Sequence, residues 1–353
     1  MLKILPYLKL AVERNASDLF FTPNAPAMLK VDGDFLSIGK TLLTTEFVRE
    51  LAFNLLTPEQ QEELREQREI DLATQAGGLG RFRVNIFTQR NQVSMVLRYV
   101  RGDIPQVDEL GLPATLKDLV MLKRGLILMV GATGSGKSTS LAAMLHHRNL
   151  NAAGHILTIE DPIEVVHSNQ RSIVNQREVG TDTHSYARAL KSALREAPDV
   201  ILIGEVRTRD TMEATLTLAN TGHLALSTLH ANSANQAMDR IINFFPEERR
   251  AQLLMDLSFN LKSIISQRLV RREAGGRVAA IEIMLNSPLI ADLIFKGEIH
   301  ELKAVMARSN EQGMITFDQF LFGLFESGEI SYEEALRNAD SKNELRLKIK
   351  LDS

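Results

Sequence analysis

Residues 126–138 read LILMVGATGSGKS, an apolar run followed by a glycine-rich segment that ends in Lys137 and Ser138. The apolar part is typical of a buried parallel strand, and residues 137–150 have the periodicity of a helix. The glycine-rich part fits the pattern G-x-x-x-x-G-K-[ST] and lies between a strand and a helix, the position in which that pattern binds phosphate. The segment therefore predicts a nucleoside triphosphate site.

The residues of this segment have separate expected tasks. Its glycines let the backbone turn amide groups inward around phosphate oxygens, and the dipole of the following helix adds positive potential. Lys137 should reach the β- and γ-phosphates, and Ser138 should ligate Mg²⁺. The predicted binding set is Gly131, Ala132, Thr133, Gly134, Ser135, Gly136, Lys137, Ser138 and Thr139. The pattern alone predicts binding and not hydrolysis.

Apolar runs and helical patterns alternate on both sides of this site. The further runs are residues 155–159, 200–203 and 224–228, and the helical patterns between them are residues 137–150, 184–196 and 208–220. Alternation of this kind predicts an α/β fold with a parallel sheet and right-handed crossovers.

Polar side chains follow three of these strands. Residues 159–164 read IEDPIE, and residues 201–205 read ILIGE. Because the carboxyl ends of parallel strands face the ligand crevice, the first group can supply a general base, although it also fits a solvated acidic loop. Glu205 is where a carboxylate on the Mg²⁺ side belongs, although it also fits an acid at a helix start. His230 could donate to the γ-phosphate or be structural, and His223 is a weaker candidate.

The regions before and after this sheet have a different pattern. Residues 1–101 predict a small mixed α/β domain with a hairpin that turns at Asp32-Gly33, and residues 102–113, rich in proline, glycine and acids, predict a linker. The region from about residue 245 predicts mostly helices, with one hairpin around residues 268–284.

Composition excludes several classes. The 353 residues contain no cysteine, so disulfides, thiol nucleophiles and cysteine-based zinc sites are impossible. With 41 basic and 44 acidic residues the net charge is −3, which gives no general case for nucleic acid or an anionic membrane surface. No segment approaches the roughly 18 consecutive apolar residues of a membrane span, so the expected compartment is the cytosol.

Taken together, four motifs resemble those of the secretion ATPases of the type II/type IV pilus superfamily. They are a P-loop, an "Asp box", an atypical Walker B motif that ends in Gly-Glu, and a His box, at residues 131–139, 158–164, 201–207 and 221–230. The resemblance implies a PAS-like N-terminal domain at 1–101, the linker at 102–113, a RecA-like P-loop ATPase domain at 114–271, and a mostly helical region at 272–353.

Within the superfamily, the short N-terminal region and the lack of cysteines resemble the PilT/PilU group of twitching-motility retraction ATPases. Residues 289–295 read LIADLIF and lack both arginines of the PilT retraction signature, which favours the PilU branch. The group implies an ATP-hydrolysing hexameric motor for type IV pilus retraction, working alone or as an accessory to a PilT-type motor. The alternatives are a related secretion or DNA-uptake ATPase, a nucleic-acid translocase and a non-hydrolysing ring component.

The resemblance also implies roles for single residues. Glu164 matches the general base for the attacking water, Glu205 the carboxylate near Mg²⁺, acting through water, and His230 the sensor of the γ-phosphate. Arginines of the N-terminal domain face a neighbour's phosphates in this family; the matching candidates are Arg81, Arg83 and Arg98. The implied partners are five further copies, an inner-membrane platform protein and a paralogous PilT motor, without nucleic acid. The implied location is the cytoplasmic face of the inner membrane.

Overall fold

The computed structural model describes residues 3–31, 33–100 and 102–352. The chain divides into two compact units. The first contains Met1–Asp103 together with Glu164–Val166, and the second contains Ile104–Ile163 and His167–Ser353. Asp32 of the predicted hairpin turn lies outside the described residues, as do Met1, Leu2 and Arg101 at the ends of the predicted first domain. Each unit is described below by itself.

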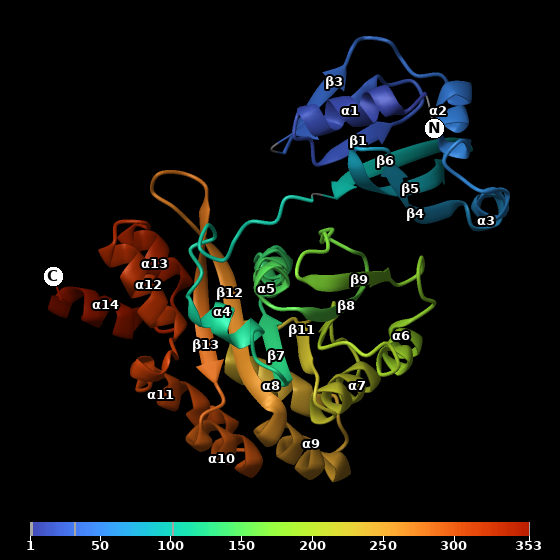
Figure 1. The fold of residues 1–353 in the computed structure, drawn as a ribbon. Coiled ribbons are helices and arrows are strands. Elements are labelled where there is room, and N and C mark those ends of the chain that lie inside the picture. Colours follow the sequence, from blue (N-terminus) through green and yellow to red (C-terminus); the bar gives the residue numbers. More distant parts are fainter. Residues whose placement is uncertain (1–2, 32, 101, 353) are drawn as a thin grey trace. The chain divides into compact units, whose positions relative to one another are not determined.

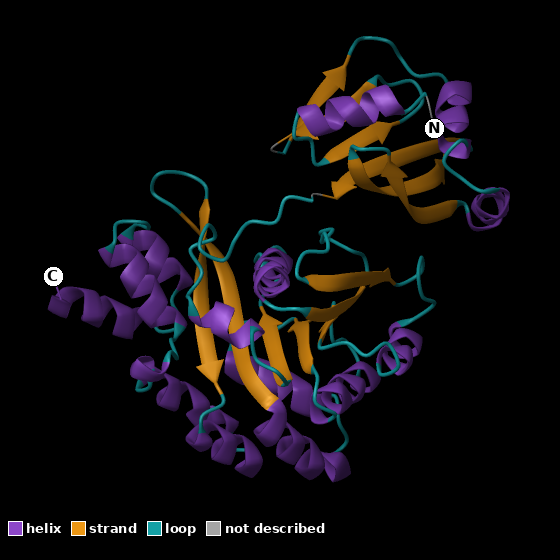
Figure 2. Ribbon diagram, in the orientation of Figure 1, coloured by secondary structure: helices purple, strands orange, loops and turns teal. Residues whose placement is uncertain are grey.

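The first unit is a six-stranded sheet with three helices (Figures 1 and 2). All neighbouring strands are antiparallel, in the order β3-β2-β1-β6-β5-β4. The elements are α1 (Leu5–Glu13), β1 (Asp18–Phe21), β2 (Ala27–Val31), β3 (Asp34–Ile38), α2 (Thr45–Phe53), α3 (Pro58–Gln67), β4 (Glu69–Ala76), β5 (Gly80–Gln89) and β6 (Gln92–Val100).

Local sequence explains the turn and caps of this unit. Arg90 and Asn91 join β5 to β6 with φ angles of 48° and 62°, which is the positive-φ geometry of a two-residue hairpin that matches the twist of the strands. The Thr44 side chain accepts from the Phe47 amide and so caps α2. Thr57 caps α3 in the same way.

The second unit contains a seven-stranded sheet in the order β13-β12-β7-β11-β10-β8-β9. Neighbouring strands are parallel except β12 and β13, which form an antiparallel hairpin. The strands are β7 (Gly125–Val130), β8 (Gly154–Glu160), β9 (Ser172–Glu178), β10 (Val200–Ile203), β11 (Leu224–Leu229), β12 (Leu261–Arg271) and β13 (Arg277–Leu285). The predicted parallel α/β sheet is therefore confirmed for the runs at β7, β8, β10 and β11.

Helices cover both faces of this sheet, and a helical group follows it along the chain (Figure 1). The helices are α4 (Thr115–Val120), α5 (Lys137–Asn151), α6 (Tyr186–Ala193), α7 (Arg209–Asn220), α8 (Ala234–Asn243), α9 (Glu247–Asn260), α10 (Pro288–Lys296), α11 (Leu302–Ala307), α12 (Phe317–Glu326), α13 (Tyr332–Asn338) and α14 (Lys342–Asp352), with short 3₁₀ helices η1 (Ile299–Glu301) and η2 (Asn310–Gln312). None of the described helices is long and apolar enough to cross a membrane.

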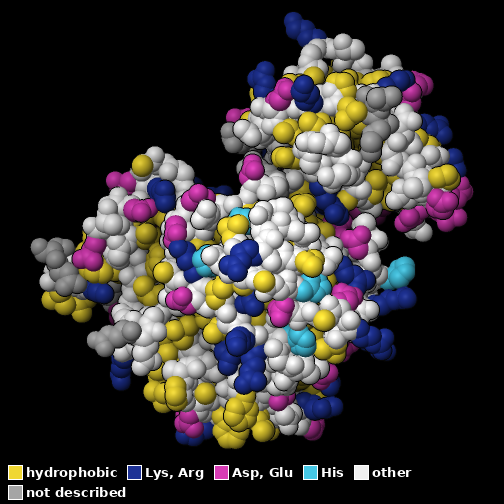
Figure 3. Space-filling model, in the orientation of Figure 1, with side chains coloured by type: hydrophobic (Ala, Val, Ile, Leu, Met, Phe, Trp, Pro, Cys, Tyr) yellow, Lys and Arg dark blue, Asp and Glu magenta, His cyan; other side chains and the backbone are white. Residues whose placement is uncertain are grey.

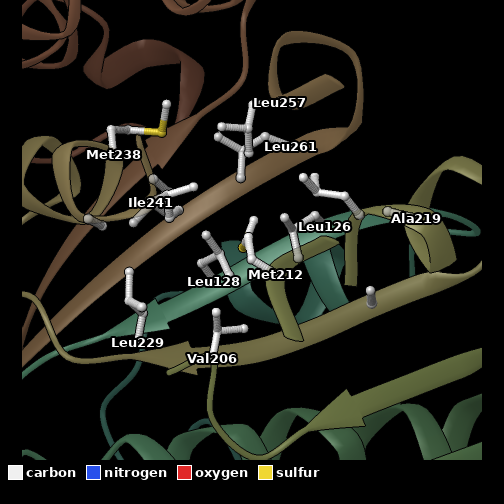
Figure 4. Close-up of a cluster of buried hydrophobic side chains, with 14 of the residues drawn as sticks. Leu126, Leu128, Val206, Met212, Ala219, Leu229, Met238, Ile241, Leu257 and Leu261 are labelled. Atoms are coloured by element: carbon white, nitrogen blue, oxygen red, sulfur yellow. The ribbon is translucent and has the colours of Figure 1, made fainter. Parts of the chain in front are cut away.

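Strand β7 is buried along its whole length because both of its faces pack against helices. Leu126 and Leu128 lie in a core with side chains from α6 to α10, part of which Figure 4 shows. Ile127 and Met129 point to the opposite face and join a second core with α4 and α5. A parallel strand with helices on both faces buries every side chain, with successive side chains in opposite cores. A continuous apolar run is therefore expected in such a strand.

The sequence did not indicate one strand of this sheet, β9. The predicted hairpin around residues 268–284 is present as β12 and β13, but β12 begins earlier than predicted. Strand β9 is polar and only partly buried, so it lacks the apolar run that marks the other strands. Strand β12 begins at Leu261, directly after α9 ends at Asn260, without a glycine or proline between them. The sequence predicted helix up to about residue 268, and the β-branched residues Ile264 and Ile265 are the signal for a strand there.

The last three helices pack on the hairpin of β12 and β13. Phe317 and Leu321 of α12 are fully buried in a separate core that includes Val270 of β12 and Val278 of β13. On the face seen in Figure 3, lysine and arginine side chains are interspersed with acidic ones. The observed architecture is a mixed α/β chain with an N-terminal antiparallel sheet, a mixed second sheet and C-terminal helices.

Candidate phosphate site at the end of strand β7

The predicted phosphate-binding segment forms the turn between β7 and α5. Gly131, Gly134 and Gly136 have φ angles of 157°, 77° and 89°, and Gly136 is the N-cap of α5. The last two values lie in the left-handed region, which glycine adopts at low cost. A Cβ atom at Gly131 would lie 2.5 Å from the backbone oxygen of Gln267 in the neighbouring strand β12. The turn therefore depends on glycine for conformation and for close packing.

Lys137 is 9% exposed and folds back over this turn. Its Nζ atom donates to the carbonyl oxygens of Gly131 at 2.7 Å and Ala132 at 2.9 Å. Burial lowers the pKa of Lys137, and the nearby Glu205 carboxylate acts in the opposite direction. The ammonium group thus lies inside the loop, where an anion would meet it.

Gln267 of β12 forms hydrogen bonds that hold the turn in place. This residue was not predicted from the sequence. It is 2% exposed, its amide nitrogen donates to the Ser135 carbonyl at 2.8 Å, and its amide oxygen accepts from the Ser140 hydroxyl of α5 at 2.8 Å. A Cβ atom at Gly136 would lie 2.6 Å from this amide nitrogen. The available signal was weak, because Gln267 lies between Ser266 and Arg268, in a short polar stretch with apolar residues on both sides.

The structure brings Glu205 and His230 together. Parallel pairing aligns Ile203 of β10 with Ser227 of β11, so the segments that follow these strands leave the sheet side by side. The Glu205 carboxylate lies 3.1 Å from His230 Nε2 and accepts from Arg207 Nε at 2.9 Å. Of the four predicted catalytic residues, Lys137, Glu205 and His230 therefore gather at one edge of the sheet.

Acidic residues at the carboxyl end of β8 lie beside this group. Glu160 accepts from the Thr158 hydroxyl at 2.6 Å and from Gln176 Nε2 at 3.2 Å. Tyr186, at the start of α6, packs with its hydroxyl 2.9 Å from where a Cβ at Gly204 would lie. Burial raises the pKa of Tyr186, and the carboxylates of Asp161 and Glu160 act in the same direction. Tyr186 was not predicted, since a tyrosine at a helix start gives no distinctive pattern.

Two further predicted site residues are Glu164 and His223. Glu164 is exposed, four residues beyond the end of β8, and Glu164–Val166 belong to the first unit. His223 directly precedes β11, at the end of the strand opposite to His230, and its Nδ1 atom lies 3.1 Å from Leu218 O, which is a local structural contact.

The predicted arginines belong to the first unit. Arg83 of β5 and Arg98 of β6 are direct cross-strand partners. Arg98 Nε donates to the buried carboxylate of Asp18 at 2.8 Å, so this arginine has a structural partner. Arg81 also has partners within the chain.

A cavity of about 640 Å³ opens beside the turn and connects it to the His230 segment. Gly131, Ala132 and His230 line it on one side, and α8 contributes Asp239 and Arg240 on the other. Its volume is in the range of small-molecule sites.

The residues present fit a triphosphate with Mg²⁺. A glycine cradle, a buried lysine inside it and the buried, unpartnered hydroxyl of Ser135 form a polar, cationic hollow. Ser138 is exposed in the first turn of α5. No group of three or more metal-ligating side chains occurs among the described residues.

Comparison with known families agrees with this geometry. The family model for type II/IV secretion system proteins matches residues 3–308. The chain belongs to this family. It is 56% identical to the type IV pilus ATPase PilU of Pseudomonas aeruginosa, over 98% of this chain and 91% of PilU. It is 42% identical to the retraction ATPase PilT of the same organism, over 94% of this chain and 96% of PilT.

The fold of this chain is also similar to solved structures of related ATPases. A crystal structure of the pilus retraction motor PilT with bound ADP superposes with a TM-score of 0.91 and 40% identity, and covers 98% of this chain and 99% of that one. The ATPase DotB of Legionella pneumophila superposes with a TM-score of 0.76 and 26% identity over 94% of each chain. The predicted resemblance to the PilT/PilU group is confirmed. Identity to PilU exceeds identity to PilT, as the missing arginines in residues 289–295 indicated.

Lys137→Met tests whether this lysine serves a ligand or the fold. The buried ammonium has a lowered pKa, so its charged form is less favourable in the folded chain than in the unfolded one. This penalty is complete below the lowered pKa and fades as the pH rises through the lowered pKa toward the ordinary value of 10.5. We expect the variant to lose nucleotide binding by titration, while its melting temperature without nucleotide stays equal or rises.

A fall in melting temperature without loss of nucleotide binding would contradict this expectation. Lys296→Met, at an exposed lysine paired with Asp292, is the matched control and should change neither quantity measurably.

Proposed function

We propose that this chain is an ATP-hydrolysing motor subunit of the type IV pilus machinery, of the PilU type, that acts in pilus retraction. The observation that carries the proposal is the meeting of Lys137, Glu205 and His230 around a glycine cradle at the carboxyl edge of a parallel sheet. The 56% identity to PilU and the ADP in the PilT structure support the choice of nucleotide and of machinery.

The proposed chemistry depends on where the charged side chains lie relative to the bound phosphates. Lys137 leaves the carbonyls of Gly131 and Ala132 and pairs with the β- and γ-phosphates of ATP, while the amides of residues 131–138 surround their oxygens. His230 lies within hydrogen-bond distance of Glu205, which fixes its ring beside the cradle and lets it respond to the γ-phosphate. When bound, Mg²⁺ would neutralise charge on the phosphates, held by Ser138 and, through water, by Glu205.

Glu164 is the proposed general base. Glu205 is held by Arg207 and His230, and Glu160 is held by Thr158 and Gln176, so both carboxylates are already engaged by donors. The exposed Glu164 is not engaged in this way and can turn toward an attacking water.

Between Arg83 and Arg98, Arg83 is the better candidate for a role across a subunit boundary. Arg98 is tied to Asp18, which is 7% exposed in its side chain, whereas Arg83 is only its cross-strand neighbour. An arginine supplied by a neighbouring subunit would stabilise charge on the transferred phosphoryl group.

The finer architecture is part of the proposal. We take residues 1–101 as a PAS-like domain, 102–113 as the linker, 114–271 as a RecA-like ATPase domain and 272–353 as the helical region. The whole chain would assemble as a homo-hexamer in which nucleotide turnover changes the angle between the two domains of each subunit. It would act at the cytoplasmic side of the inner membrane on a platform protein, beside a PilT-type motor. No nucleic acid takes part.

Glu164→Gln tests the assignment of the base. It removes proton acceptance and keeps side-chain size, so turnover should fall by about 10²- to 10⁴-fold while ADP affinity is retained. Phosphate release and ADP titration measure the two quantities. Glu213→Gln, at an exposed carboxylate of α7 paired with Arg209, is the control and should keep normal turnover. Turnover within threefold of the parent in Glu164→Gln would remove this residue from the mechanism.

Arg83→Ala tests the arginine. If it acts on a neighbour's phosphates, turnover of the assembled ring falls while nucleotide affinity of the dilute subunit is unchanged. Arg98→Ala serves as comparison, since it leaves the buried Asp18 carboxylate without its partner and should lower the melting temperature instead. An Arg83→Ala ring with parental turnover would contradict the role.

Deletion in the host tests the proposed machinery. We expect pili that still assemble but withdraw poorly, seen as reduced twitching with retained surface pilin. Complementation with the Glu164→Gln variant should not restore withdrawal if turnover of this subunit is needed. Loss of surface pili on deletion would contradict a retraction role, and full rescue by Glu164→Gln would favour a non-hydrolysing ring component.

A further inference from the structure

Gln267 holds the carbonyl of one peptide in the phosphate cradle. Its side chain is fully enclosed, at 2% exposure, and both ends of its amide are used. The nitrogen donates to Ser135 O at 2.8 Å, and the oxygen accepts from Ser140 Oγ at 2.8 Å. A flip of the amide would place its oxygen against the Ser135 carbonyl and lose that hydrogen bond, because a carbonyl can only accept, whereas the Ser140 hydroxyl can pair with either end.

This contact determines where a cradle amide points. In a trans peptide the C=O and N–H groups point to opposite sides. Because Gln267 pulls the carbonyl of Ser135 toward β12, the N–H of Gly136 in the same peptide points away from β12. Gly136 has a φ of 89° and is the N-cap of α5, so its amide belongs to the positive end of that helix.

Strand β12 is a firm base for this contact. After a register shift between Leu261 and Ser263 it pairs regularly with β7, with Ser266 opposite Val130, which sets Gln267 beside Gly131. The next residue, Arg268, donates to Asn232 O at 3.1 Å and to Asp340 at 2.6 Å. Asn232 lines the cavity together with His230. One strand thus fixes the P-loop through Gln267 and the His230 segment through Arg268.

We propose that Gln267 is a positioning residue for phosphate binding, which orients the Ser135–Gly136 peptide so that its N–H faces the bound phosphates. This inference rests on the proposed nucleotide site and adds a residue that acts on it from the side opposite to the ligand. Gln267 does not itself touch the phosphates, because its amide is occupied by Ser135 and Ser140.

Gln267→Leu is the first test. It preserves approximate volume but leaves the Ser135 carbonyl unpartnered, so the peptide is free to turn. We expect the dissociation constant for ADP, measured by calorimetry on the full chain, to rise about ten- to hundredfold, the range expected when a buried polar group loses its partner. Ser140→Ala keeps the bond to Ser135 and should stay within threefold of the parent. Parental ADP affinity in Gln267→Leu overturns the inference.

Gln267→Glu is the second test, and its readout is the pH dependence of ADP affinity, which a purely structural role would not change. It also keeps the inference testable if Gln267→Leu fails to fold. An ionised carboxylate can only accept hydrogen bonds and repels Ser135 O, whereas the protonated form regains a donor. We expect the ratio of variant to parental dissociation constants for ADP to fall at least fivefold from pH 8 to pH 6. A ratio that does not fall overturns the inference. If the parental chain binds no ADP, the proposed function fails instead.

Discussion

Close packing of β12 against the end of β7 is the constraint on which the site depends. The backbone and side chain of Gln267 come so near to the turn that Cβ atoms at positions 131 and 136 would lie 2.5 and 2.6 Å from its atoms. Glycine at these positions is therefore required by the neighbouring strand as well as by a ligand. Burial of β7 on both faces holds the two strands in register and so maintains this approach.

The same parallel register assembles the rest of the site. Polar residues that follow β10 and β11 meet because the strands end at one edge, and Thr228 Oγ1 donates to Gly204 O at 2.6 Å across the two strand ends. Glu205 and His230 then lie within hydrogen-bond distance of each other and beside the cavity that reaches the P-loop. A sheet edge, a cationic loop and a paired carboxylate are the parts that phosphoryl transfer requires.

Much of this arrangement is predictable from local sequence. Apolar runs before the P-loop and before Glu205 marked β7 and β10, and the glycine pattern marked the turn between β7 and α5. Local sequence does not show which distant residues become neighbours in the folded chain. Gln267 and Ser135 are 132 residues apart in the sequence. They meet only because of the order of the strands in the sheet. Strand β9 was missed because it lies at a sheet edge, where polar residues are tolerated.

The most direct test of the central claim is a crystal structure of the chain with Mg²⁺ and a non-hydrolysable ATP analogue. The account predicts phosphates within the turn at residues 131–138, with Lys137 Nζ moved from the carbonyls of Gly131 and Ala132 to the phosphate oxygens. It also predicts that Ser135 O stays bonded to Gln267. Phosphates bound elsewhere, with Lys137 still on those two carbonyls, would contradict it.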